Sequence, residues 1–412
     1  MAILIKNIKQ LLQVREKFKL KWIAGAAMAD LPCIENAYLS IEKDKIVAFG
    51  KMEDCTIDNA NETIDASGKI VLPAWCDSHS HLVFAGNRAG EFVDKIKGLS
   101  YEQIAAKGGG ILNSAKKLNE TSEEALLQQA LNRCNEIMET GTGAIEIKSG
   151  YGLTVESEIK MLRVVQKLKA LTPLTIKATF LGAHAVPASY KKNKQNYVEL
   201  IIKEMLPQIA QENLADFVDV FCELNYFTIN EMEQILEAAA HFNLQPKVHV
   251  NQFNSFGAIK AAVKHNALSV DHLEVLKDED IAALQNSTTM PVALPSCSLF
   301  INIPFAPARK IIDAGLPLAL ASDYNPGSTP SGNMQLVVAL ASIKQKLIPN
   351  ETINAVTING AYAMGLHSKM GSITIGKKAN LIITKPIDSV AEIPYWFGNN
   401  IVEQLILNGK LI

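Results

Sequence analysis

Strand-like and helical segments alternate through the middle of this 412-residue sequence, and both of its ends consist of short strand-like segments. Such alternation predicts a parallel sheet, and eight repeats predict an α/β protein with a closed (β/α)8 TIM-type barrel. A hydrophobic fraction of 48% and a charged fraction of 20% fit a well-packed globule. We therefore expect a barrel that carries a small β-sandwich domain formed by the N- and C-terminal segments.

The expected barrel strands are apolar runs bounded by polar or helical segments. They cover residues 70–79, 144–148, 174–180, 217–221, 246–250, 267–271, 291–294 and 318–322. Amphipathic segments at 123–139, 156–170 and 230–240 are the clearest helices between them. Hairpin-like runs at 37–41 and 45–50, with strand-like runs at 62–68, 371–377 and 381–384, predict the terminal domain. The expected division is a composite sandwich from 1–70 and 366–412 and a barrel from 71–365.

Composition and charge exclude several classes of partner. A net charge of −2 gives no reason to expect nucleic acid or an anionic membrane. There is no uninterrupted apolar run of about 18 residues for a membrane span, and residues 1–6 lack the layout of a signal peptide. The six cysteines are scattered without short spacings, which favours reduced thiols in a cytoplasmic protein.

Five of the eight histidines lie at or just past the end of a predicted strand. These are His79, His81, His184, His249 and His272, and Asp323 follows another strand. The carboxyl ends of barrel strands meet at one mouth, so His79, His81, His249 and Asp323 can form a metal site with an open position for water. Zinc or iron in such a site lowers the pKa of a bound water to about 7, which makes it a nucleophile.

His272 and Asp323 are the candidates for proton transfer beside that metal. Any one of these histidines alone is equally well explained as a structural residue, but five at strand ends favour a site. His241, His265 and His367 follow no strand end, and we interpret them as structural.

Several strings along nearly the whole chain resemble the amidohydrolase superfamily. The superfamily is marked by residues 77–81, 270–272 and 322–323. The strings at 81–88, 108–111, 146–153, 179–187 and 323–328 are similar to those of members that open a cyclic amide in histidine degradation. The resemblance implies hydrolysis of 4-imidazolone-5-propanoate to N-formimidoyl-L-glutamate by a metal-activated water. It also implies one zinc or iron ion on His79, His81, His249 and Asp323, and a homodimer.

The same resemblance assigns residues to the substrate. It implies contacts from Arg88, Tyr151, His184, Gln252, Asn325, Gly327 and Ser328. A guanidinium group forks onto a carboxylate with two hydrogen bonds, so Arg88 is expected to hold the propionate arm. Glycine at 327 permits a close backbone approach to the ligand.

Two positions need separate interpretation. Relatives carry Glu or Gln where this chain has Gln252, and an amide cannot accept a proton from water. We therefore assign proton transfer to His272 and Asp323. Gln252 completes the predicted catalytic set as the residue that orients the substrate. Lys148 lies at a strand end, where some superfamily members hold a bridging lysine, but the resemblance favours a mononuclear centre and a salt-bridging Lys148.

Alternative interpretations remain open at this point. An aminohydrolase of nucleobase-like rings would leave the charge of Arg88 unpaired, and a non-catalytic barrel would have no use for four metal ligands. Gly108 to Gly110 lack the Lys-Ser/Thr of a P-loop, which favours a mobile loop over the active-site mouth. Cys76, Cys222 and Cys297 are interpreted as small buried hydrophobic residues.

Overall fold

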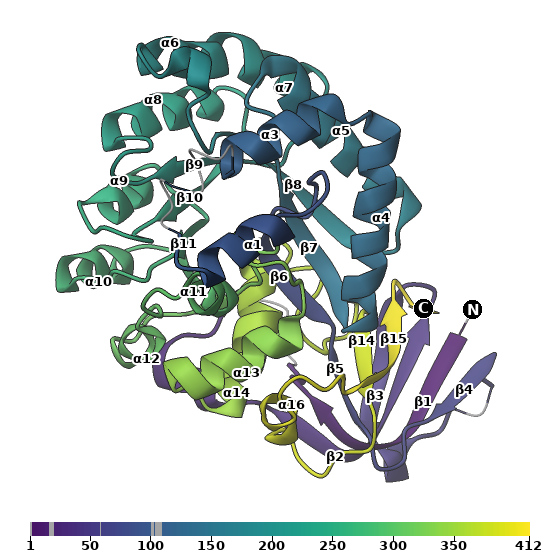
Figure 1. Ribbon diagram of the computed structural model, residues 1–412. Coiled ribbons are helices and arrows are strands. Elements are labelled where there is room, and N and C mark those ends of the chain that lie inside the picture. Colours follow the sequence, from purple (N-terminus) through teal and green to yellow (C-terminus); the bar gives the residue numbers. More distant parts are fainter. Residues whose placement is uncertain (1, 16–19, 58, 100–102, 104–108) are drawn as a thin grey trace.

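The computed structural model describes residues 2–15, 20–57, 59–99, 103 and 109–412. Within these residues the strands form two eight-stranded sheets. Figure 1 shows one of them ringed by helices and the other beside it, built from both ends of the chain. Among the described helices, none has the length and apolar character needed to cross a membrane.

The barrel sheet is parallel throughout, as predicted. Its strands are β6 (Trp75–Ser80), β7 (Thr142–Lys148), β8 (Thr175–Ala183), β9 (Phe217–Cys222), β10 (Gln245–Val250), β11 (Ser269–His272), β12 (Met290–Ala293) and β13 (Ala319–Leu320). Hydrogen bonds from Asp323 N to His79 O and from His81 N to Tyr324 O, both 2.9 Å, close it between the first strand and the last. The seam of the barrel therefore runs through three of the predicted metal ligands.

Helices cover the outside of the barrel, and local capping signals explain where the clearest ones begin. Ser122 and Thr154 accept hydrogen bonds from the third backbone N–H of α4 and α5, and Thr228 forms a capping box with Glu231 in α8. The helices are α1 (Ala89–Ile96), α3 (Ile111–Glu120), α4 (Glu123–Glu139), α5 (Val155–Leu171), α6 (Lys194–Leu200), α7 (Leu206–Gln211), α8 (Ile229–Ala240), α9 (Ala258–Lys264), α10 (Asp278–Gln285), α11 (Pro295–Ile301), α12 (Ala308–Asp313), α13 (Met334–Gln345), α14 (Pro349–Asn354), α15 (Gly360–Ala363) and α16 (Glu392–Tyr395).

The two ends of the chain share one mixed sheet, which confirms that they pack together. It contains β1 (Ala2–Leu12), β2 (Cys33–Glu42), β3 (Lys45–Lys51), β4 (Glu62–Asp65), β5 (Ile70–Pro73), β14 (Leu381–Thr384), β15 (Val402–Leu407) and β16 (Lys410–Leu411). β5 pairs with β1 on one side and with β14 on the other. Buried side chains such as Ile5, Leu39 and Ile383 form its own apolar cluster.

Two expectations about strands were wrong. Residues 70–79 form two strands rather than one, because β5 belongs to the terminal sheet and β6 to the barrel. Pro73 has no N–H for a ladder bond, and Ala74 N bonds to Asn380 O between the two sheets. Residues 371–377 form no strand, and only Ile373 makes an isolated bridge, to Val14. The domain boundaries at 70 and 366 stay a prediction.

Candidate active site

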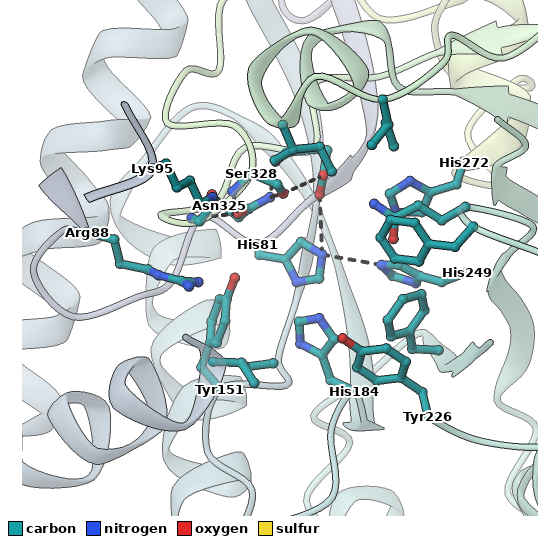
Figure 2. Close-up of a pocket in the computed structure, with 18 residues that line it drawn as sticks. His81, Arg88, Lys95, Tyr151, His184, Tyr226, His249, His272, Asn325 and Ser328 are labelled. Atoms are coloured by element: carbon teal, nitrogen blue, oxygen red, sulfur yellow. Dashed lines mark hydrogen bonds and ion pairs between the residues drawn. The ribbon is translucent and has the colours of Figure 1, made fainter. Parts of the chain in front are cut away.

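Three histidines from two barrel strands converge at the carboxyl end of the barrel. His79 lies near the end of β6, His81 just beyond it and His249 on β10, and their ligand nitrogens all lie within 4.8 Å of one another. His81 Nε2 is 3.4 Å from His249 Nε2, as Figure 2 shows. Asp323 Oδ1 is 3.6 Å from the Nε2 atoms of both His79 and His81.

These separations fit a metal ion. Ligands at about 2.0–2.1 Å from a tetrahedral ion lie about 3.3–3.4 Å from each other. The Nε2 atom of His79 is buried and has no hydrogen-bond partner among the described residues, which is costly unless a cation takes its lone pair. The structure thus brings together the four predicted ligands as a site for a divalent metal.

Two aspartates behind the cluster orient its rings. Asp271 Oδ2 is 2.6 Å from His79 Nδ1, and Asp219 Oδ2 is 2.8 Å from His249 Nδ1. A carboxylate that accepts the Nδ1–H leaves the Nε2 lone pair facing the metal. This role of the two aspartates was not predicted, because Asp271 and Asp219 lie 192 and 30 residues from the histidines that they contact.

A fully buried charge network lies beneath these aspartates. Lys148 Nζ is 2.6 Å from Glu146 Oε1 and 2.8 Å from Asp219 Oδ2. Lys247 donates to the other oxygen of Glu146 and, at 2.8 Å, to Ser78 O. Burial opposes the charge on Lys148, but Asp219 and Glu146 outweigh burial and raise its pKa. The salt-bridging interpretation of Lys148 is confirmed, because its ammonium group faces carboxylates.

Burial also sets the protonation of the ligand histidines. It lowers the pKa of His79, His81 and His249 well below the usual value, and neighbouring cationic groups lower it further. These rings are therefore neutral at physiological pH, which is the form that binds a metal. Burial raises the pKa of Asp323, and His272 opposes this shift.

A cavity of about 480 Å³ opens above the cluster. Its lining includes every residue predicted to bind substrate, namely Arg88, Tyr151, His184, Gln252, Asn325, Gly327 and Ser328. His81, His249, His272 and Asp323 also line it, so the metal ligands and the predicted substrate residues share one space. His79 is not among the lining residues and is fully buried.

Comparison with known proteins identifies the family to which this barrel and site belong. The model of the amidohydrolase family matches residues 70–412. The chain belongs to the amidohydrolase family. It is accordingly a metal-dependent hydrolase, and the histidine cluster is the candidate site for its metal ion.

Similar proteins within the family span the whole chain. The imidazolonepropionase of Flavobacterium johnsoniae is 62% identical over 412 residues, which cover 100% of both chains. That of Fusobacterium nucleatum is 41% identical over 413 residues, covering 100% of this chain and 98% of the other.

Solved structures of a triazine hydrolase and of an adenosine deaminase share the fold at low identity. A triazine hydrolase variant aligns with a TM-score of 0.76 at 16% identity, covering 100% of this chain and 94% of that one. An adenosine deaminase from Xanthomonas campestris with bound zinc aligns with a TM-score of 0.69 at 15% identity, covering 99% and 92%. At this identity the likeness concerns the fold alone.

The candidate proton-transfer residues of this amidohydrolase have unusual backbone. His272 has φ of 91° and Asp323 φ of 55°, in a region that side chains other than glycine rarely adopt. Such strain is concentrated at functional sites. Glu274 Oε1 lies 3.5 Å from His272 Nδ1; burial lowers the pKa of His272, but Glu274 and nearby carboxylates raise it overall.

The loop after Asp323, the predicted fourth metal ligand, is organised by Asn325. Its side-chain oxygen accepts from the backbone N–H groups of Gly327 and Ser328, each at 2.8 Å. Its Nδ2 donates to Ser328 Oγ at 2.7 Å, and Ser328 Oγ donates to Asp323 Oδ2 at 3.2 Å. Asn325 therefore holds the loop against the carboxylate of Asp323 as well as lining the cavity.

The position of Arg88 differs from the expectation that its whole guanidinium group is free to bind the substrate. Its Nε and Nη2 atoms lie 2.8 and 2.7 Å from Glu91 Oε2. One edge of the guanidinium group is thus already occupied within the protein. Lys95 also lines the cavity, and the sequence analysis missed it although it follows Arg88 at helical spacing.

The remaining predictions have mixed outcomes. Gly108 lies outside the described residues and Gly110 precedes α3, so the mobile loop stays a prediction. Cys76 and Cys222 are buried in apolar clusters, as predicted. Cys297 is also buried in an apolar cluster, as predicted, and its Sγ lies 3.6 Å from Nε2 of Gln252, which lines the cavity.

Proposed function

We propose that this amidohydrolase is an imidazolonepropionase, which opens 4-imidazolone-5-propanoate with one water to form N-formimidoyl-L-glutamate. The observation that carries the proposal is one cavity with three clustered histidines and Asp323 at its base and two cationic side chains in its wall. Identity of 62% over full length to an imidazolonepropionase supports the same assignment.

We propose zinc or iron as the metal, held by His79, His81, His249 and Asp323. Three imidazoles and a carboxylate suit either ion. When bound, the ion supplies an activated water and polarises the carbonyl under attack. The two aspartates that fix the His79 and His249 rings keep this site in shape.

The chain's own groups handle orientation and protons. His272 lines the cavity and donates a hydrogen bond to the ring carbonyl oxygen, which strengthens as negative charge develops there. Asp323 faces the histidines with Oδ1 and Ser328 with Oδ2. It accepts the proton of the attacking water and passes it to the departing ring nitrogen, and a raised pKa makes it a better acceptor.

The remaining lining residues position the substrate. Arg88 lies on the side of the cavity opposite His249 and His272 in Figure 2, with Tyr151 and His184 between them. A substrate whose ring sits at the metal site therefore extends its propionate arm toward Arg88. Gln252 contributes an orienting hydrogen bond to the ring.

The rival activity is hydrolytic deamination of a neutral heterocycle. The same barrel and metal site would serve that reaction, but a neutral ring would leave Lys95 in the cavity wall without an anion, because Glu91 already pairs with Arg88. Release of ammonia from cytosine or guanine is the direct measure of this alternative.

The test is product formation by purified, metal-loaded protein. Substrate is generated in situ from urocanate, and N-formimidoylglutamate is followed by mass spectrometry with and without a chelator. We expect product that the chelator abolishes and that added zinc or iron restores. His249→Ala should form no product. His241→Ala, at an exposed position just after α8, should form product as wild type does. Absence of product from metal-loaded wild type would overturn the assignment.

We also propose a cytoplasmic homodimer. All six cysteines are free thiols, which fits a reducing compartment. Light scattering on the purified protein measures the mass directly, and a mass of one chain would contradict the dimer.

A further inference from the structure

Helix α1 presents two cationic side chains to the active-site cavity. Arg88 directly precedes the helix, and Lys95 lies in its last turn. Lys95 is seven positions after Arg88, which is about two helical turns, so the two side chains project from the same face. Both line the cavity, and Figure 2 shows both side chains on the side away from His249 and His272.

The two cations differ in how they are neutralised. Arg88 is held by Glu91 through Nε and Nη2, and the side chains of this pair are only 13% and 12% exposed. The pair therefore has no net charge, and it leaves one edge of the guanidinium group for a ligand. Glu91 is further held by Asn113 at 3.4 Å, which keeps the carboxylate on Arg88.

Lys95 has no such partner within the described ranges. No described carboxylate lies within 4.0 Å of its Nζ atom, whose hydrogen bond goes to the backbone oxygen of Gly327 at 3.4 Å. Burial lowers the pKa of Lys95, and the charge of Arg88 lowers it further. A partly buried ammonium group that faces a cavity without an anion is stabilised by an anionic ligand.

Gly327 brings the two cations to one place. A Cβ atom at this position would lie 2.2 Å from Arg88 Nη1, so a side chain here would require the guanidinium group to shift. The carbonyl oxygen of the same residue accepts the hydrogen bond from Lys95. The free edge of Arg88 and the ammonium group of Lys95 thus meet beside one backbone segment.

We infer that Lys95 is a further substrate-binding residue, whose ammonium group takes the carboxylate of the substrate together with Arg88 and restricts the site to anionic substrates. This inference rests on the proposed function, in which that carboxylate is the propionate arm. Glu91 cancels the charge of Arg88, so Lys95 supplies the net positive charge that selects an acid over a neutral analogue.

The experiment compares one acid with its neutral counterpart. Binding of 3-(imidazol-4-yl)propanoate and of its primary amide to the zinc-loaded protein is measured by calorimetry. Lys95→Gln should lower the affinity for the acid about tenfold, which is the scale of one charge-assisted hydrogen bond, and should leave the affinity for the amide unchanged. Lys95→Arg should keep most of the preference for the acid. With the true substrate, Lys95→Gln should raise KM more than it lowers kcat.

Lys97→Gln is the matched control, because it removes the same charge at the end of the same helix from an exposed position. It should change neither affinity. Equal binding of the acid by Lys95→Gln and wild type, or no preference for the acid in wild type, would overturn the inference. Product formation by wild type decides the proposed function independently of these binding measurements.

Discussion

The base and the wall of the active-site cavity are built on different principles. The base, defined here as the four metal ligands with Asp219, Asp271, Lys148 and Glu146, lies almost entirely on strands and is buried. The wall, defined here as α1 with residues 325–328, lies on a helix and a loop and is partly exposed. Lys148 in the base has two close carboxylate partners, Glu146 and Asp219, whereas Lys95 in the wall has one backbone contact.

This difference indicates that the base serves the chemical reaction and that the wall selects the substrate. Strand-borne groups with several buried partners cannot shift without breaking a network, which suits a metal site that needs fixed geometry. A helix and a loop tolerate changes of side chain, so the same barrel can serve different substrates. Substitutions in the base should therefore abolish function or stability, and substitutions in the wall should change affinity.

The largest effect is expected at Asp323. Asp323→Ala should remove a metal ligand and the proposed proton carrier together, lowering kcat/KM at least about a thousandfold. Metal content by mass spectrometry and product formation measure the two losses. Full activity of Asp323→Ala with metal bound would contradict the proposed roles of Asp323 as metal ligand and proton carrier. It would also contradict the expectation that substitutions in the base abolish function.

The next effect is on stability. Glu146→Gln leaves Lys148 and Lys247 with less compensating charge in a fully buried network, and we expect a loss of about 3–5 kcal/mol in the free energy of unfolding. Urea unfolding provides the measurement. Glu123→Gln breaks a partly exposed surface pair with Lys167 and should cost less than about 1 kcal/mol. Similar losses for the two variants would remove the energetic contrast between the base network and the surface.

A smaller effect is expected behind the metal ligands. Asp271→Asn keeps the shape of the side chain but weakens its hold on the His79 ring, and metal affinity should fall about 10–100-fold. Competition with a chelator of known affinity gives the constant. Asp278→Asn, at an exposed position where α10 begins, is the matched control and should leave metal affinity unchanged. Unchanged affinity in Asp271→Asn would show that the ring needs no carboxylate.

The smallest of these effects is expected at Gln252. Gln252→Ala removes an orienting amide from the cavity but no proton carrier, so KM should rise about tenfold while kcat changes less. Steady-state kinetics separates the two parameters. Loss of all turnover at saturating substrate would place Gln252 in the chemistry and not only in orientation.

Local signals in the sequence were sufficient for the helices and for the metal ligands. The segment predicted over 123–139 is helix α4 with the same bounds, because Ser122 caps it and its apolar spacing is helical. His79, His81, His249 and Asp323 were found because the carboxyl ends of parallel barrel strands must meet. By this rule, residues that are far apart in the sequence are expected to share one site, even when the geometry of their side chains is not known.

The partners of those residues depend on tertiary structure. Asp271 lies 192 residues from His79, and no local pattern states that their side chains are 2.6 Å apart. Glu91, which occupies the fork of Arg88, and the exposure of Lys95 to the cavity depend on where α1 packs. The sequence by itself determined the barrel and predicted four candidate metal ligands, since the strand period and strand order place these residues at one mouth. Only the folded chain decided which charges are neutralised, because pairing depends on distances between elements.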